Sequence, residues 1–510
     1  MYPGAFAALT PDRPAAILHE TGERLSYAEL EERSVRLSRV LHNVGLRKGD
    51  TIALVAGNDL HYFEIYWAAL RSGLYFTPVN WHLTAEESAY IVNDSGARVL
   101  IVSAQHAELA RQLAGETPAV EVRLAFGGTV PGYDDYEQAL AAAPPEPLNE
   151  QPLGASMLYS SGTTGRPKGI RHPLQPASVK DGNPTVAMIS RLWGFDRGTV
   201  YLCPAPLYHA APLGYSSWVQ MCGGTVVVLR KFDPVEALAA IEQHRVTHGQ
   251  WVPTHFIRML KLPGEVRARF DHSSLVAAIH AAAPCPVDVK RAMIDWWGPI
   301  IGEYYSSTEG AGMTLIMADE WLRKPGSVGR AVVGVVRICA DDGTELGPGE
   351  VGTVYFERDE LPFRYHNDPA KTAAAQHPKQ PNWTTTGDVG YLDSDGYLFL
   401  TDRKSFMIIS GGVNIYPQEV ESCLALHPDV LDVAVIGVPD PEMGEAVLAV
   451  VQPMPGVTAG PALEAKVIAY ARERIAHYKA PRAVSFVDEL PRTPTGKLRK
   501  HLLREKFGSR

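Results

Sequence analysis

Helix and strand signals alternate along the first hundred residues of the chain. Ser26 and Glu29 have the spacing of a capping box, and apolar residues then recur at helical spacing as far as Gly45. Residues 51–56 (TIALVA) form a continuous apolar run, which predicts a buried strand, and a second helical pattern follows and ends at Gly73. Because strands alternate with helices, we predict a parallel sheet covered by helices, and hence an α/β protein.

The 510 residues are too many for one simple core, so more than one domain is expected. From about Gly329 to Leu400, short β-rich runs are separated by glycine-containing turn signals, which predict a small β-barrel-like subdomain. The final hundred residues contain strand signals around one helical stretch. We therefore predict a large N-terminal domain at residues 1–402, with its β-rich part at about 329–400, and a small α+β C-terminal domain at residues 403–510.

The composition argues against several classes of protein. The formal net charge of −9 argues against nucleic acid as a partner. The five cysteines lie far apart and form no CxxC pair, so they predict reduced thiols and neither a zinc site nor a disulfide framework. No apolar stretch approaches the roughly 18 residues of a membrane span, and the first residues lack a signal-peptide pattern. We expect a cytoplasmic monomer or homodimer without a transmembrane segment, while peripheral membrane contact stays open.

Residues 159–169 (YSSGTTGRPKG) have the composition of a phosphate-binding loop. Glycines let the backbone approach a ligand closely, hydroxyl groups donate hydrogen bonds, and a lysine supplies positive charge. The residues with these properties are Ser160, Ser161, Gly162, Thr163, Thr164, Gly165 and Lys168. The segment is not a Walker A loop, because Pro167 stands before the lysine where that motif has glycine. A kinase or GTPase of the P-loop class is therefore disfavoured.

This string resembles the phosphate loop of the adenylate-forming superfamily, which contains acyl-CoA synthetases, the adenylation domains of peptide synthetases and firefly luciferase. Four further segments resemble elements of that family and follow in the family's order. They are residues 304–310 (YYSSTEG), 385–388 (TTGD), 401–421 (TDRKSFMIISGGVNIYPQEVE) and 491–497 (PRTPTGK). The resemblance covers essentially the whole chain, and its pattern is most similar to acyl-CoA synthetases of the fatty-acid type.

The resemblance implies a nucleotide site. Tyr305 is expected to stack on adenine, Thr308 to contact the phosphates, and Glu309 to hold Mg²⁺, a hard cation that prefers oxygen ligands. Asp388 is expected to accept hydrogen bonds from the ribose hydroxyls, and Arg403 to contact the ribose or a phosphate. The expected ATP- and AMP-binding set is completed by Ala283 and the loop residues named above.

The resemblance also implies a two-step reaction that uses ATP, Mg²⁺ and coenzyme A. In the first step, Lys497 is expected to bridge the carboxylate and the α-phosphate while pyrophosphate leaves. Lys168, Thr164 and Glu309 are the other residues expected to be catalytic. The carboxylate becomes an acyl-adenylate, and the CoA thiolate then displaces AMP.

The C-terminal domain of the family rotates between the two steps, which implies a hinge and a second set of contacts. Gly411 and Gly412 match the glycines that let the pantetheine arm of CoA pass close to the backbone. Ser405 stands at the expected hinge position, where the family commonly has aspartate or lysine, and Phe406 follows where aspartate is usual.

Four residues are expected by resemblance to line the acyl pocket: His209, Trp251, Ala281 and Ala282. A buried structural role is the other interpretation of His209. The two alanines replace glycines that are usual in the family. Because the expected lining is apolar and no cationic residue stands out, we predict a hydrophobic acid as the substrate, whether fatty, branched or cyclic.

The acyl acceptor is also suggested by pattern. Residues 206–214 (PLYHAAPLG) lack the aspartate with which peptide-synthetase domains hold an amino group, so an amino acid substrate is disfavoured. The stretch from Asp388 to Ser405 is compact and lacks an insertion usual in fatty acyl-AMP ligases, which favours CoA. Nothing supports luciferase activity. Two alternatives stay open: an acyl-AMP ligase that loads a carrier protein, and a non-catalytic relative that binds nucleotide or acyl-adenylate, favoured only by the departure at Ser405 and Phe406.

Overall fold

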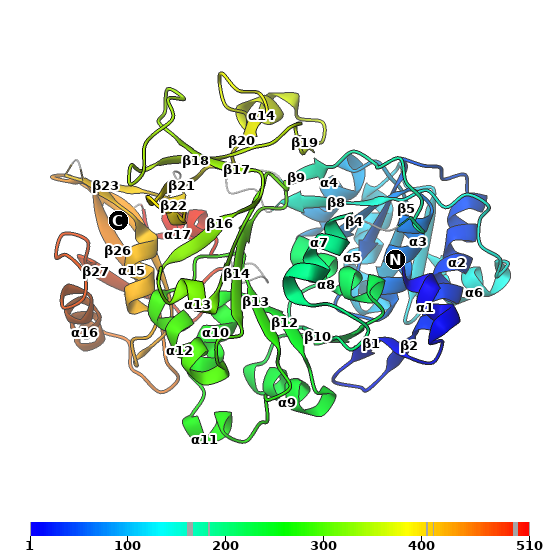
Figure 1. The fold of residues 1–510 in the computed structure, drawn as a ribbon, viewed down its shortest axis with the longest axis horizontal. Helices are drawn as coiled ribbons and strands as arrows, with labels where there is room; N and C mark the ends of the chain where they lie inside the picture. The colour runs from blue at the N-terminus through cyan, green and yellow to red at the C-terminus, as the bar shows by residue number, and fades with distance from the viewer. Residues whose placement is uncertain are drawn as a thin grey trace. The chain divides into compact units, whose positions relative to one another are not determined.

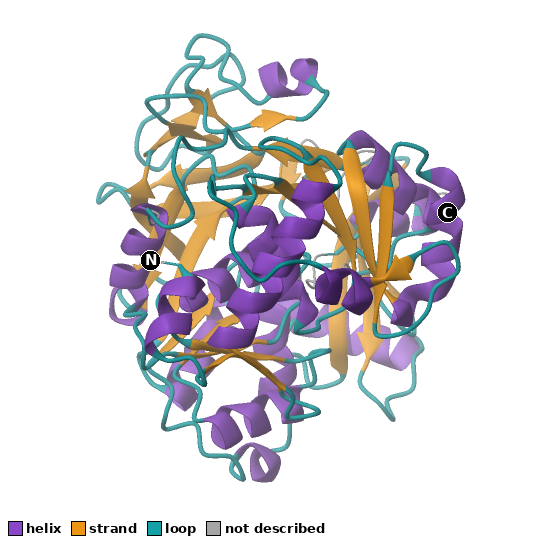
Figure 2. Ribbon diagram, turned by 90° about the vertical axis from the view of Figure 1, so that its right-hand side faces the viewer, coloured by secondary structure: helices purple, strands orange, loops and turns teal. Residues whose placement is uncertain are grey.

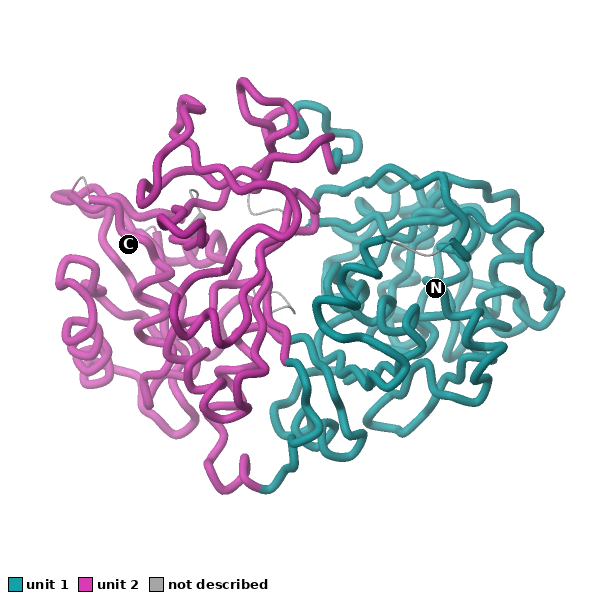
Figure 3. The backbone as a smooth tube through the Cα atoms, in the orientation of Figure 1, with its two compact units in different colours: residues 1–250, 269–277, 363–372 teal, residues 251–268, 278–362, 373–510 magenta. Residues whose placement is uncertain are grey.

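The computed structural model describes residues 2–160, 167–181, 184–403, 406–411, 413–492 and 498–508, with the backbone alone at residues 402 and 403. These residues form two compact units (Figure 3). The first contains residues 1–250, 269–277 and 363–372, and the second contains residues 251–268, 278–362 and 373–510. In both units helices lie against strands, as Figures 1 and 2 show, so the predicted α/β fold class is confirmed.

An eight-stranded sheet in the first unit has the predicted parallel arrangement at its centre. Strands β4, β3, β5 and β6 run parallel, and β8 is parallel to β4. The strands in sheet order are β19 (Arg364–Tyr365), β9 (Lys168–Arg171), β8 (Ala155–Ser160), β4 (Tyr75–Val79), β3 (Thr51–Val55), β5 (Ala97–Ser103), β6 (Val122–Phe126) and β7 (Asp134–Asp135). Every residue of β3 is buried, as expected for a strand covered on both faces.

A second set of strands in the first unit is also mainly parallel. β10 pairs in parallel with β11 and β12, β11 pairs in parallel with β1, and β2 is antiparallel to β1. The strands in order are β12 (His248–Trp251), β10 (Val200–Cys203), β11 (Thr225–Val228), β1 (Pro14–Leu18) and β2 (Arg24–Ser26).

The helix boundaries of this unit follow the sequence signals. The Ser26 hydroxyl accepts a hydrogen bond from the Glu29 amide, and the Glu29 carboxylate accepts one from the Ser26 amide at 2.8 Å, so the predicted capping box is confirmed. Gly45 and Gly73 follow the next two helix ends with φ of +90° and +70°. The helices are α1 (Pro3–Leu9), α2 (Tyr27–Asn43), α3 (His61–Arg71), α4 (Ala85–Asp94), the 3₁₀ turn η1 (Ala104–His106), α5 (Ala107–Glu116), α6 (Tyr136–Ala142), α7 (Pro184–Trp193), α8 (Ala210–Met221), α9 (Pro234–His244) and α14 (Pro369–Ala374), whose last two residues count with the second unit.

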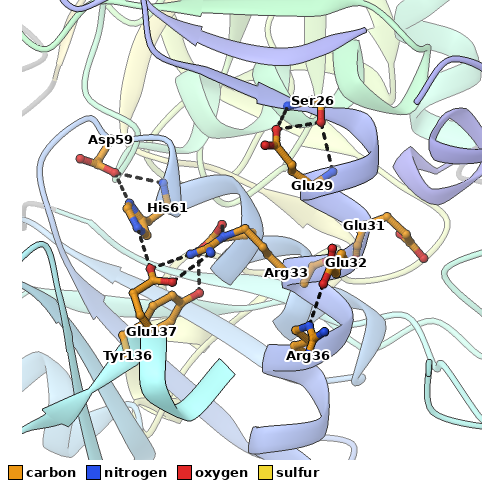
Figure 4. Close-up of polar contacts among 12 residues, drawn as sticks. Ser26, Glu29, Glu31, Glu32, Arg33, Arg36, Asp59, His61, Tyr136 and Glu137 are labelled. Atoms are coloured by element: carbon orange, nitrogen blue, oxygen red, sulfur yellow. Dashed lines mark hydrogen bonds and ion pairs between the residues drawn. The ribbon is translucent and has the colours of Figure 1, made fainter. Parts of the chain in front are cut away.

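An ion-pair network joins α2, α3 and α6 (Figure 4). The Arg33 guanidinium pairs with the buried Glu64 carboxylate and also donates to both oxygens of Glu137, at 2.7 and 3.0 Å. The Tyr136 hydroxyl donates to Glu64 at 2.7 Å, and the His61 ring lies 3.3 Å from Glu137. A buried carboxylate is costly without such partners, so the network fixes the three helices against one another.

Antiparallel strands occupy the segment of the second unit that was predicted to be β-rich. β13 and β14 are parallel, and the other described pairs along this path are antiparallel. The strands in order are β17 (Val335–Cys339), β18 (Gly352–Glu357), β21 (Asp388–Leu392), β22 (Leu398–Arg403), β16 (Ser327–Val333), β15 (Met313–Met317), β14 (Ile301–Ser306) and β13 (Ala277–His280), with β20 (Trp383–Thr384) paired to β18. The helices beside them are α10 (Pro253–Leu260), α11 (Gly264–Arg267), α12 (Val287–Trp297) and α13 (Ala318–Trp321).

The last part of the chain has the predicted α+β composition. Its strands in order are β24 (Val413–Ile415), β23 (Ile408–Ser410), β26 (Gly444–Pro453) and β25 (Val430–Asp440), with β27 (Ala483–Phe486) parallel to β26. Its helices are α15 (Pro417–Leu424), α16 (Pro461–Arg472) and α17 (Lys500–Phe507). Buried aliphatic residues from both helices and strands, such as Val420, Val435 and Val467, form its core. Among the described residues of the chain, no helix has the length and apolar character needed to cross a membrane.

Candidate active site

Two antiparallel strands form the stem of the predicted phosphate loop. β8 ends at Ser160 and β9 begins at Lys168, and these two residues are partners in the ladder. Gly169 is packed so tightly that a Cβ there would lie 2.9 Å from the side chains of Met157 and Tyr159. The Lys168 ammonium lies 5.7 Å from the centroid of the Tyr365 ring, on β19. Lys168 is therefore the first residue of β9 and follows the predicted phosphate loop in the sequence.

Asp94 and Asn367, which the sequence analysis missed, hold this stem through hydrogen bonds. The Tyr159 hydroxyl donates to Asp94 Oδ2 at 2.6 Å, and Asn367 Nδ2 donates to Asp94 Oδ1 at 3.2 Å. Burial and the neighbouring Asp94 carboxylate raise the pKa of Tyr159, so its hydroxyl keeps its proton and acts as a donor. The His366 amide donates to the Gly169 carbonyl at 2.8 Å. Asp94 and Asn367 lie far from the motif in sequence, and no local signal identifies them.

The predicted nucleotide residues Tyr305 and Asp388 are brought together at the ends of two strands. The Tyr305 hydroxyl donates to Asp388 Oδ2 at 2.7 Å, and the Thr386 hydroxyl donates to the same oxygen at 2.8 Å. Gly387 has a φ of +84°, so the turn before Asp388 uses a conformation that favours glycine. The two donors fix the carboxylate in one orientation, which is what recognition of a ribose diol requires.

The loop that contains Thr308 and Glu309 is held at both ends. The Ser306 hydroxyl donates to the Gly312 carbonyl at 2.7 Å, and a Cβ at Gly312 would overlap the Phe356 ring. Arg358 Nη1 lies 3.3 Å from the carbonyl oxygens of both Gly310 and Ala311. Arg358 is thus a supporting residue that the sequence motifs did not reveal. Both Thr308 and Glu309 are half-buried.

The expected acyl-pocket residues have different surroundings. Trp251 is fully buried, with its ring centroid 5.4 Å from that of Trp297, and its carbonyl accepts a hydrogen bond from the amide of the buried Ala281 at 3.3 Å. Ala282 is exposed and has a φ of +75°, while Ala283 is half-buried. Trp251, Ala281, Ala282 and Ala283 all lie in the second unit.

His209, the fourth residue expected in the acyl pocket, lies in the first unit. It is half-buried and immediately precedes α8. Its ring centroid lies 4.4 Å from that of Tyr208, and its amide donates to the Pro206 carbonyl at 3.2 Å. These contacts fix the backbone at the start of α8.

His280, which directly precedes Ala281 in the chain, belongs to a buried cluster of charged and titratable residues. Lys290 Nζ donates to Glu303 Oε2 at 2.6 Å, and His280 Nε2 lies 3.5 Å from the same oxygen. Burial raises the pKa of Glu303, against the opposing effect of Lys290, and burial lowers the pKa of His280. Burial also raises the pKa of the Cys285 thiol, so it stays protonated. The described residues include no group of histidine, cysteine and acidic side chains that could hold a metal ion.

The glycine hairpin of the C-terminal part is constrained by close packing. Gly411 has a φ of +57°, its amide donates to the Met443 carbonyl at 2.8 Å, and a Cβ at this position would overlap the Met443 side chain. Ile409 and Val413, on either side of the turn, are exposed. The structure therefore explains why glycine is needed at position 411.

Phe406, which departs from the family pattern, packs beside the last helix. Lys500 Nζ lies 5.2 Å from the Phe406 ring centroid, and Arg504 donates to the Phe406 carbonyl at 3.4 Å. Lys500 also pairs with Glu421 at 2.8 Å. The aromatic ring thus has cationic partners where the family has an aspartate.

Several predicted site residues lie outside the described residues. They are Ser161, Gly162, Thr163, Thr164, Gly165, Ser405, Gly412 and Lys497, together with the side chain of Arg403. Their roles stay predictions. The described residues next to Lys497 pair across the segment, since Arg492 and Leu498 form an antiparallel bridge.

Family models match nearly the whole chain. Residues 5–364 match the AMP-binding enzyme model, and residues 419–497 match the model of the AMP-binding enzyme C-terminal domain. The chain belongs to the AMP-binding enzyme family. The predicted boundary between residues 402 and 403 falls in the interval between the two matches.

Several relatives of this AMP-binding enzyme that align over nearly their whole length are named as CoA ligases or CoA synthases. A feruloyl-CoA synthase of Amycolatopsis sp is 36% identical over 499 residues, which is 97% of this chain and 96% of the relative. The long-chain-fatty-acid–CoA ligase FadD13 of Mycobacterium tuberculosis (strain ATCC 25618 / H37Rv) is 33% identical over 512 residues, 99% of this chain and 97% of the relative. The crystal structure of the anthranilate CoA ligase AuaEII with anthranoyl-AMP has a TM-score of 0.85 at 25% identity and covers 99% of this chain and 96% of its own.

These matches confirm three predictions: the adenylate-forming superfamily, the fold class and the enzyme class of AMP-forming acid–thiol ligase. Enzymes of this class use ATP, Mg²⁺ and CoA, as was predicted.

Proposed function

We propose that this enzyme joins a hydrophobic carboxylic acid to coenzyme A in two steps. A carboxylate oxygen attacks the α-phosphorus of ATP, the bond between that phosphorus and the oxygen bridging to the β-phosphate breaks, and pyrophosphate leaves. The CoA thiolate then attacks the acyl carbon, and AMP leaves with the electrons of the broken C–O bond. The observation that supports this most is the full-length similarity to CoA ligases, whose two family domains both match this chain.

The residue roles belong to the same proposal. Lys168 neutralises charge on the phosphates, and Glu309 would hold Mg²⁺, which would supply charge neutralisation at the phosphate oxygens. Asp388, oriented by Tyr305 and Thr386, accepts hydrogen bonds from the ribose. The described contacts of Asp388 fit its role, because they hold its carboxylate before any ligand binds. Lys497 supplies the second cation at the reacting atoms.

The proposed substrate class follows from the residues expected to form one wall of the acyl pocket. Trp251 lies in an aromatic cluster, and Ala281 and Ala282 add only methyl groups. Such a wall favours an acid with an apolar body, whether fatty, branched or cyclic. A cytoplasmic location and the division into domains at residues 1–402 and 403–510 are also part of this proposal.

The test is AMP release from ATP and Mg²⁺ with a panel of acids that includes acetate, octanoate, palmitate, benzoate and cyclohexanecarboxylate. We expect AMP release that depends on CoA for one group of the hydrophobic acids, with the acyl-CoA detected by mass. Acid-dependent pyrophosphate exchange without thioester formation would instead indicate a carrier protein as the acceptor, which holo carrier protein would test. No turnover with any acid would contradict the proposal and favour a binding-only relative.

A further inference from the structure

Two buried polar atoms in an aromatic cluster of the second unit, shown in magenta in Figure 3, have no hydrogen-bond partner among the residues that the structure describes. They are Trp251 Nε1 and His280 Nδ1. The cluster consists of Trp251, Phe256, His280 and Trp297, and all four side chains are buried. The Phe256 ring centroid lies 6.3 Å from that of Trp251 and 5.5 Å from that of His280, so both polar residues pack on one ring.

Both atoms require a polar partner. An indole N–H can only donate, so Trp251 Nε1 needs an acceptor, and the faces of neighbouring rings accept an N–H only weakly. His280 is kept neutral by burial and by Lys290, and in either tautomer its Nδ1 is a donor or an acceptor. A buried polar atom without a partner has lost its hydration without compensation, and such atoms are rare in native proteins. Two of them in one cluster indicate a polar group that the described chain does not supply.

The cluster lies where the substrate acid is expected. Trp251 is the last residue of β12, and His280 is the last residue of β13. Ligands of open α/β sheets bind at the carboxyl ends of the strands. The Ala281 amide donates to the Trp251 carbonyl at 3.3 Å, so two residues expected to line the acyl pocket are in direct contact. A group on the acid is therefore a partner that fits this place.

We propose that the substrate acid carries a hydrogen-bond acceptor on its apolar body and that Trp251 Nε1 donates to this acceptor. The acceptor is a neutral hydroxyl, ether or keto oxygen, because burial of a charged group among aromatic rings costs more than one neutral donor returns. Trp251 is thus a specificity-determining residue. The inference rests on the proposed function, and it narrows the substrate class to hydrophobic acids that carry an oxygen substituent.

The experiment compares oxygenated acids with their parent acids. Octanoate and cyclohexanecarboxylate are each compared with analogues that carry one hydroxyl or keto group at successive positions, and benzoate with its hydroxy and methoxy derivatives. The measured quantity is kcat/KM from CoA-dependent AMP release. It is expressed as the ratio of the analogue to its parent, because this ratio cancels general changes in activity.

Two variants separate the indole N–H from the packing of the ring. Trp251→Phe removes the N–H and keeps an aromatic ring. Trp297→Phe is the matched control, because it makes the same change in the same cluster, at a ring centroid 5.4 Å from that of Trp251, and leaves Trp251 Nε1 in place.

In the wild-type enzyme we expect a ratio of about 10 to 100 for at least one analogue, because an acid without the acceptor leaves the indole N–H buried and unpaired. Trp251→Phe should lower this ratio to about one, since the phenyl ring has no donor to satisfy. Trp297→Phe should keep most of the wild-type ratio, whatever its effect on the absolute rates.

Wild-type ratios of about one for every analogue would overturn the inference even if neither variant folds, and would indicate that a buried water molecule meets the indole N–H. A ratio that survives in Trp251→Phe, or that falls equally in both variants, would overturn it as well. An enzyme that releases no AMP with any acid contradicts the proposed function itself, and the inference with it.

Discussion

At the scale of single residues, Ala282 has an unusual backbone conformation for its side chain. Its φ of +75° lies in the left-handed region, where an alanine costs about 1–2 kcal/mol relative to the right-handed form. Such residues persist where the surrounding structure determines the backbone, and they gather at functional sites. The preceding Ala281 is buried and hydrogen-bonded to Trp251, which holds the segment in place. The sequence shows two alanines where glycines are usual, but it does not show which of them is strained.

Replacement of Ala282 by glycine should stabilise the protein by about 0.5–1 kcal/mol, because relief of strain exceeds the added entropy of the unfolded chain. The measurement is urea denaturation followed by fluorescence. Ala281→Gly is the control and should destabilise by about 1 kcal/mol, since Ala281 is buried and has no positive φ. Equal effects of the two substitutions would show that the φ of Ala282 stores no strain.

At the scale of elements, the β8–β9 stem depends on residues from distant parts of the chain. Tyr159 on β8 is tied to Asp94 at the end of α4, and β9 pairs with β19. The strands flanking the phosphate segment therefore have their direction set by tertiary contacts. Because these two strands are already fixed, they lose less conformational entropy when ATP binds.

Tyr159→Phe should raise the KM for ATP several-fold and cost about 1.5 kcal/mol of stability, because it removes one hydrogen bond to a carboxylate. Tyr133→Phe is the matched control, since the Tyr133 hydroxyl donates to the Ala110 carbonyl on α5 at 2.9 Å and makes no hydrogen bond to Asp94. Steady-state kinetics and thermal unfolding measure both quantities. A KM for ATP that is the same in both variants would contradict a role of the stem in nucleotide binding.

The buried pair of α12 and β14 should show a pH dependence once it is broken. Lys290→Met leaves the Glu303 carboxylate buried without its cation, and removal of one partner of such a pair costs about 3–5 kcal/mol. Burial already raises the pKa of Glu303, and loss of Lys290 raises it further. The folded state then binds a proton more tightly than the unfolded state, so stability should fall as the pH rises above the unfolded pKa of about 4.5.

Urea midpoints at pH 5.5 and 8 measure this effect. The double variant Lys290→Met/Glu303→Gln is the control. Because glutamine does not titrate, the stability of this variant should change little between the two pH values. A single variant with the same midpoint at both pH values would contradict the assignment.

Much of the local structure was predictable, and most of the tertiary structure was not. The capping box at Ser26, the strand at 51–56 and the β-rich character of 329–400 depend on neighbouring residues, and the structure confirms them. The family motifs predicted that Tyr305 and Asp388 lie in one site, because the motifs of a family reflect its tertiary contacts. Asp94 and Arg358 were missed, since a single acidic or basic residue without a motif has no local signal of its partner.

At the scale of the whole molecule, the proposed reaction requires one small domain to serve two steps. The structure pairs Arg492 with Asp432 on β25, and it holds Gly411 in the β23–β24 hairpin on a different part of the same domain. Substitutions at these two places should therefore separate the steps. A change that only destabilised the domain would affect both steps equally.

Lys497→Ala should slow acyl-adenylate formation by about a hundredfold or more, the usual cost of removing a group that stabilises developing charge, and leave the CoA step nearly intact. Gly411→Ala should do the opposite, because its φ of +57° and its contact with Met443 leave no room for a Cβ on the hairpin proposed to admit CoA. Single-turnover assays of each step measure both variants. Parallel losses in the two steps would contradict the proposed division of roles.

The pairing of β9 with β19 has a consequence for biosynthesis. Ribosomes synthesise the chain from its N-terminus. Strands β3 to β6 can therefore assemble early, because short crossovers join them. The hairpin of β8 and β9 follows, but its outer edge has to wait for residues 364–365 before it gains a neighbour. An open strand edge is a site of mispairing with other chains, so nascent chains stalled before residue 364 should depend on chaperones more than full-length chains do.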